Sequence, residues 1–102
     1  MALREKAQET IAVAEELRRS VEEAFLASMH TELNVIGTLC LLAEQEDGEK
    51  RARHLKLAEK AFETILELAS RVEPDTQNRH AIEEARHNIH QLGGRDFLKP
   101  RG

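Results

Sequence analysis

The sequence predicts an all-α fold: a long first helix and a returning second helix form an antiparallel hairpin, a short third helix follows, and two copies build a dimeric four-helix bundle. Of the 102 residues, 40% are hydrophobic and 33% are charged, which is typical of amphipathic helices. Apolar residues recur every three or four positions, as they do along one face of a helix. Turn and breaker residues at Asp47-Gly48, Pro74 and Gly93-Gly94 divide the chain into three such segments.

The first helix should run from Leu3 to about Gln45, a span without proline and with Gly37 as its only glycine. Such a helix would be ~65 Å long at 1.5 Å per residue, so either the C-terminal third folds back along it or a second copy packs on it. Residues 1–24 form its coiled-coil-like half, because small or apolar residues follow a near-heptad spacing. These are Leu3, Ala7, Ile11, Ala14, Leu17, Val21 and Ala24. The spacing favours a homodimer.

The second half of this helix is much more apolar. Between Phe25 and Ala43 the only charged residue is Glu32, and apolar side chains cover more than half of the helix circumference. We therefore expect residues 25–73, the helical hairpin, to form the bundle core. The narrow polar strip contains His30 and Asn34, which lie four residues apart and so side by side on a helix.

The second helix should run from about Glu49 to Val72, after a turn at Glu46–Glu49. Its apolar positions alternate in steps of three and four, the pattern of a helix packed on a neighbour. They are Leu55, Ala58, Phe62, Ile65, Ala69 and Val72. Pro74 should end this helix, and either Asp75 or Thr76 can cap the next one.

The third helix falls within residues 75–92 and should extend from about Gln77 to Leu92, with a thinner apolar face at Ile82, Ala85, Ile89 and Leu92. Two placements are open: it packs back on the first half of helix one, or it begins another unit. Residues 93–102 are predicted to be a flexible tail.

Composition argues against several classes of function. The net charge of −4 disfavours nucleic acid as a partner, since phosphate binding needs a concentrated positive face. A single cysteine, Cys40, permits no intrachain disulfide and fits a reducing compartment. The apolar run from Phe25 to Ala43 has nearly membrane-spanning length, but polar side chains at its centre disfavour insertion. We expect a cytoplasmic protein with no membrane insertion.

Residues on both helices of the hairpin resemble a known family. Phe25, Leu26 and Ala27 precede His30, and Leu33, Asn34, Ile36 and Gly37 follow it; the returning helix carries Leu55, Ala58, Ile65 and Leu68. In this order they resemble the dimerisation and histidine-phosphotransfer hairpin of two-component sensor kinases. The resemblance covers roughly residues 20 to 73.

The resemblance implies roles for two residues. His30 would be the phosphoacceptor, and Asn34 would position the phosphate or a water molecule. A response-regulator-like or kinase partner would hold Mg²⁺, so no cofactor is expected in this chain. Thr31 follows His30 where the family has an acidic residue, and about one helical turn of the family's segment, with its proline, is missing. No Gly-rich ATP loop follows, so we expect no autonomous catalysis: at most a phosphotransfer protein or a histidine kinase fragment.

Two other functions stay open. A non-enzymatic helical dimerisation or adaptor scaffold needs nothing beyond the apolar faces. A surface metal site is the weaker alternative: Glu84, His87 and His90 lie about one turn apart on the third helix, and carboxylate and imidazole at this spacing bind zinc or iron in some bundles.

Overall fold

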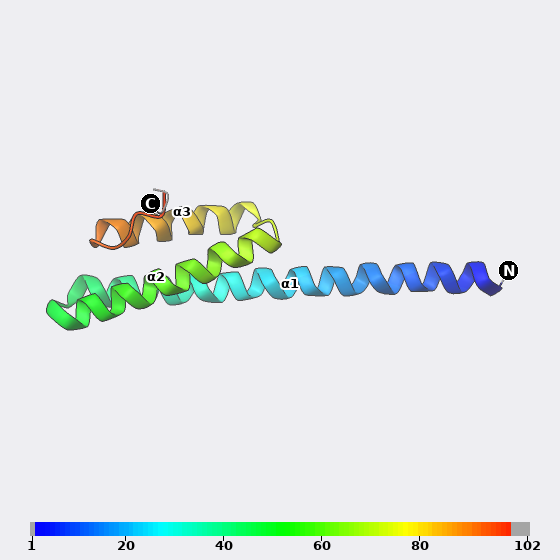
Figure 1. Ribbon diagram of the computed structural model, residues 1–102, viewed down its shortest axis with the longest axis horizontal. Coiled ribbons are helices and arrows are strands. Elements are labelled where there is room, and N and C mark those ends of the chain that lie inside the picture. The colour runs from blue at the N-terminus through cyan, green and yellow to red at the C-terminus, as the bar shows by residue number, and fades with distance from the viewer. Residues whose placement is uncertain (1, 99–102) are drawn as a thin grey trace.

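The chain folds into three helices without a strand in the part that the computed structural model describes, residues 2–98, of which residues 2–5 are described by their backbone alone. The helices are α1 (Ala2–Gln45), α2 (Gly48–Arg71) and α3 (Thr76–Gln91). Figure 1 shows α2 running back along α1, and α3 reversing again to lie over both. The all-α prediction is confirmed, and its three helices are those observed; the dimeric bundle stays a prediction.

Local signals in the sequence set the helix boundaries. Gly48, the first residue of α2, adopts a left-handed backbone (φ 61°) directly after the turn from α1, where a side chain would be strained. The Asp75 carboxylate accepts a hydrogen bond of 2.8 Å from the Asn78 backbone N–H, so Asp75 caps α3 as one of the two predicted candidates. Pro74 lies between the end of α2 and this cap.

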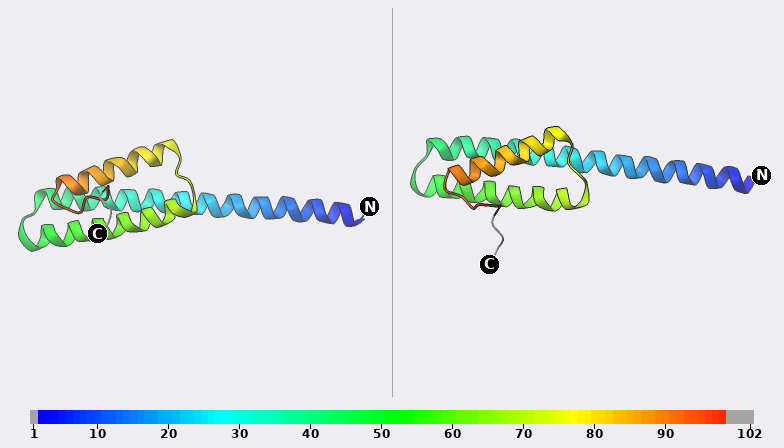
Figure 2. Two further views of the ribbon diagram at one scale, coloured as in Figure 1. Left: turned by 45° about the horizontal axis from the view of Figure 1, so that its top comes forward. Right: turned by 90° about the horizontal axis from the view of Figure 1, so that it is seen from above.

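The hydrophobic core lies where α2 and α3 both pack on the second half of α1 (Figure 2). Phe62 of α2 is its largest fully buried side chain. The third helix therefore covers the second half of α1, whereas one of the two predicted placements had it on the first half. The buried apolar residues are Met29, Leu33, Ile36, Cys40, Ala43, Ala58, Phe62, Ile65, Ala85 and Ile89.

The first part of α1 extends beyond this core as a single helix (Figure 1). We call residues 2–24 the stalk and residues 25–98 the body. Every residue from 6 to 24 is exposed, and the molecule measures 70 × 28 × 21 Å. Within the described chain, nothing covers the apolar positions of the stalk.

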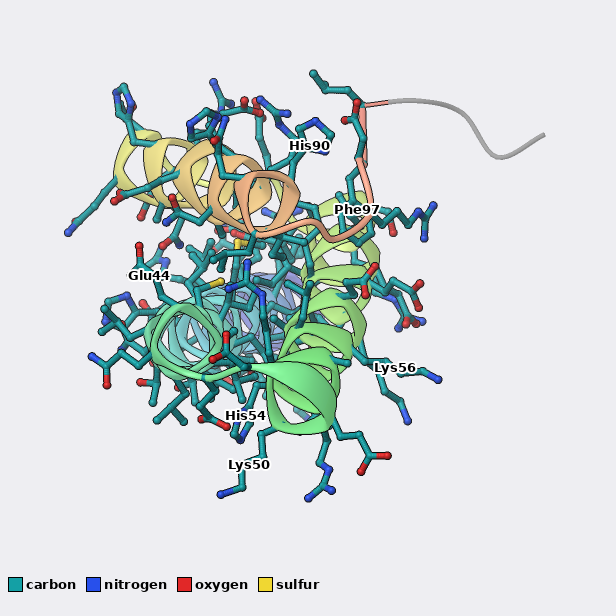
Figure 3. All side chains as sticks on the ribbon, turned by 90° about the vertical axis from the view of Figure 1, so that its left-hand side faces the viewer. Glu44, Lys50, His54, Lys56, His90 and Phe97 are labelled. Atoms are coloured by element: carbon teal, nitrogen blue, oxygen red, sulfur yellow. The ribbon has the colours of Figure 1, made fainter. Side chains whose placement is uncertain are left out.

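The segment after α3 turns back onto α2. Gly93 (φ 94°) ends the helix, and the Phe97 ring packs against the Phe62 ring with centroids 4.5 Å apart. The Arg95 backbone N–H donates to Glu59 Oε2 at 3.0 Å, and its guanidinium lies 4.5 Å from the Phe97 ring centre. Figure 3 shows Phe97 beside α2. Residues 93–98, predicted to belong to the flexible tail, thus have defined partners; residues 99–102 lie outside the described part.

Candidate functional site

His30 and Asn34 lie at a groove between α1 and α3. The groove has a volume of about 240 Å³. Its apolar floor comes from both helices and includes Ile36 and Ala85. Its polar lining residues are His30, Asn34, Gln77, Asn78, Glu84 and Asn88. Half of the site is thus contributed by a helix to which the sequence analysis assigned no part in the chemistry of His30.

The register between the two helices places His30 level with the beginning of α3. Lining residues advance in the same direction along both helices, from His30 to Gly37 on α1 and from Gln77 to Asn88 on α3. The same order continues in an adjoining cavity lined by Cys40 of α1 and Leu92 at the end of α3. The two helices are therefore parallel.

The His30 imidazole is exposed and makes no hydrogen bond within the described residues. The neighbouring Thr31 hydroxyl does not reach it, since that hydroxyl donates to the Ala27 carbonyl oxygen at 3.1 Å. No lysine or arginine among the described residues lines the groove. His30 can therefore offer a ring nitrogen to a reactant, whereas positive charge for a phosphoryl reaction has to come from a partner.

Asn78 is a groove residue that the sequence analysis did not identify. It is 6% exposed and is the buried polar residue of the described chain. Its backbone N–H is held by Asp75, but its side-chain amide has no hydrogen-bond partner in the described residues. In the sequence, Asn78 lies three residues after Asp75, and this spacing indicates only a helix cap. Nothing in the spacing indicates that the Asn78 side chain faces α1.

The three weak metal candidates are not brought together. Glu84 lines the groove towards α1, whereas His87 and His90 are exposed on α3. Figure 3 shows His90 pointing away from α1 and α2. No group of three histidine, cysteine, aspartate or glutamate side chains in the described chain is arranged to hold a metal ion.

An uncharged stripe runs along the exposed side of α1, through both stalk and body. Its threonine hydroxyls turn back onto their own helix: Thr10, Thr31 and Thr38 donate to the carbonyl four residues earlier, at 2.8, 3.1 and 3.2 Å. Its larger members remain uncovered, with Leu17 62% and Val35 42% exposed. The stripe consists of Ala7, Thr10, Ala14, Leu17, Val21, Ala24, Ser28, Thr31, Val35, Thr38 and Leu42, all exposed.

The same helix has a second notable property. The segment Lys6–Gln45 is long and apolar enough to cross a membrane by length and composition alone, a property that core helices of soluble proteins share. His30 and Asn34 lie within it. The prediction of a cytoplasmic chain stays a prediction.

Cys40 lies on the core side of α1, in the cavity that adjoins the groove. Burial raises the pKa of its thiol, and the nearby Glu44 carboxylate raises that pKa further. The thiol is therefore held in its protonated, weakly nucleophilic form.

No family model matches the chain, and the searches of curated proteins and of solved structures find no similar protein. The groove and the stripe are therefore the structural features that bear on function.

Proposed function

We propose that the protein is a phosphotransfer module of the two-component type, in which His30 accepts a phosphoryl group from a response-regulator-like or kinase partner. The observation that carries the proposal is the state of His30: an exposed imidazole without a hydrogen-bond partner in the described part of the chain, fixed on the packed half of α1 at an open groove. Asn34, one turn further on, has an amide that can donate to a phosphoryl oxygen.

The phosphoryl transfer needs only groups that this chain and its partner supply. An unprotonated ring nitrogen of His30 attacks phosphorus in line, and the bond from phosphorus to the donor's acyl or nucleotide oxygen breaks. The imidazole then loses its remaining N–H proton to solvent. The partner contributes Mg²⁺, which neutralises the developing charge, while this chain contributes a rigidly placed nucleophile.

The module would act as a homodimer. The uncharged stripe of α1 gives each copy a continuous surface on which an equivalent helix can pack, with no charged side chain to desolvate. The same stripe favours a second candidate function, a dimerisation or adaptor scaffold without phosphate chemistry, because that function requires only the stripe.

Phosphoryl transfer from a panel of phosphorylated response regulators distinguishes the two functions. The phosphotransfer proposal predicts an acid-labile label on the wild-type chain and its loss in His30→Ala. His80→Ala is the matched control, since His80 is also exposed but lies on α3 outside the groove; it should keep the label. Absence of label with every donor, in a chain that dimerises normally, would contradict phosphotransfer and leave the scaffold.

A further inference from the structure

We propose that the first turn of α3 is the phosphoryl-binding half of the His30 site, and that Asn78 and Gln77 are its positioning residues. The inference rests on the proposed function, since it concerns the group that His30 would carry. It assigns a role to a helix that lies outside the resemblance at residues 20 to 73.

The strongest observation is the side chain of Asn78. Its residue is 6% exposed, it lines the groove at the His30 end, and its amide has no partner in the described residues. Neither polar atom of this side chain is among the fully buried atoms without a partner, so the amide opens onto the groove and is available to bind a group placed there. An oxygen-rich group on His30 would provide acceptors for its N–H donors.

The backbone at the same place also lacks partners. In the described chain, Asp75 satisfies the N–H of Asn78 and of Arg79, but the N–H groups of Thr76 and Gln77 make no hydrogen bond. Exposed N–H groups and the positive end of a 16-residue helix favour an anion. The Gln77 side-chain amide is a further donor on this turn, and it lines the groove.

The charges around the groove indicate which anion fits. The Glu84 carboxylate lines the groove about two turns beyond Asn78, and the Asp75 carboxylate caps the helix. No cation among the described residues lines the groove to offset them. Neutral donors beside carboxylates are too weak to capture free phosphate, but they can orient a phosphoryl group that is already bonded to His30.

Chemical phosphorylation tests this without any protein donor. Phosphoramidate transfers its phosphoryl group to imidazole: the donor's P–N bond breaks, a new P–N bond forms, and ammonia leaves as ammonium. Phosphorus NMR of the intact chain follows the phosphohistidine signals, and the signal that is missing in His30→Ala is assigned to His30. Proton–nitrogen NMR follows the side-chain amide signals. Inorganic phosphate alone is added in a parallel titration.

We expect phosphorylation of His30 to shift the side-chain amide signals of Asn78 and Gln77, and inorganic phosphate to leave them unchanged. Gln77→Ala should shorten the half-life of the His30 phosphoryl group roughly 3- to 10-fold, the effect of one lost hydrogen bond. Asn78→Asp should shorten it further, because a carboxylate of the same shape repels the group. Gln91→Ala, an exposed amide of α3 outside this groove, is the control and should have no effect.

Gln77 is exposed, so its alanine variant should fold normally, as a thermal melt will verify, even if Asn78 variants are unstable. Unchanged amide signals and half-lives on a phosphorylated His30 would overturn the inference and leave the proposed function standing. Labelling of exposed histidines such as His80 but not His30 would overturn it as well. If phosphoramidate phosphorylates His30 but no response regulator does, the proposed function alone would be overturned.

Discussion

The two halves of α1 belong to one unbroken helix but have opposite surroundings. In the body, Met29, Ile36 and Ala43 are at most 1% exposed, because α2 and α3 pack against them. In the stalk, Ile11 is 60% exposed and Leu17 62%. Most helical stability in proteins comes from packing of an apolar face, so the halves should differ in what keeps them helical.

The stalk and the body therefore depend on different sources of stability: association for the stalk, and an internal core for the body. The body has its own core, so most of its free energy of unfolding should remain when the protein concentration is lowered, even though the stripe continues along its α1 face. The stalk has only its stripe, so its helical state should depend on association and therefore on concentration. The following predictions test this separation, from the largest expected effect to the smallest.

Phe62→Ala should destabilise the body most. Phe62 is 1% exposed and packs in the core and against Phe97, so its truncation leaves a cavity costing about 3–5 kcal/mol in the free energy of unfolding. Urea denaturation followed by circular dichroism measures the loss. Leu66→Ala on the same helix is the control: Leu66 is 45% exposed, so its loss should stay within about 0.5 kcal/mol. Similar losses in both variants would refute the assigned core.

Leu17→Glu should weaken association about 100-fold or more, because each dimer would lose two buried leucines and gain two buried carboxylates. Sedimentation at several concentrations measures the dimer, and circular dichroism should show helix loss confined to the stalk. The matched control is Ala12→Glu, which adds the same charge on the opposite side of the stalk. If both variants dimerise equally, the stripe is not the interface.

Cys40 provides the smallest effect, inside the body. Because its pKa is raised, iodoacetamide should alkylate it more slowly in the folded chain than in denaturant at the same pH. Glu44→Gln removes the second cause of the shift, and should raise the folded rate only roughly twofold, since Glu44 is exposed and its charge is screened. Equal rates in folded and unfolded chains would contradict the burial of this thiol.

The same shift has a consequence for stability. The folded state holds the thiol proton to higher pH than the unfolded state does. The stability contributed by Cys40 is therefore fully present below the unfolded pKa and is lost as the pH rises through the folded pKa. Cys40→Ser should reduce this loss at alkaline pH.

The helices could be predicted from sequence because their signals are local. The turn at Gly48, the end of α2 before Pro74 and the cap at Asp75 each involve residues next to the boundary that they set. The apolar periodicity likewise identified buried positions such as Phe62 and Ile65. His30 and Asn34 could be selected because their spacing alone makes them neighbours on a helix.

The placement of α3, the fold-back after it and the second half of the groove were not predictable in this way. They depend on contacts between segments far apart in the chain. A Cβ atom on Gly94, for example, would lie 3.1 Å from Leu55 Cδ1 of α2, a contact that exists only once α3 lies on α2. Asn78 likewise acquires its place beside His30 only through that packing.

The back-bonded threonines of the stripe bear on how a lone chain behaves in water. Each hydroxyl is satisfied by its own helix and can exchange that bond for one to solvent, so the exposed face tolerates hydration better than a stripe of leucines would. The small side chains between Leu17 and Val35 also offer little contact area per turn. We therefore expect pairs that form and separate reversibly, with subunits exchanging between them, and not a permanently locked complex.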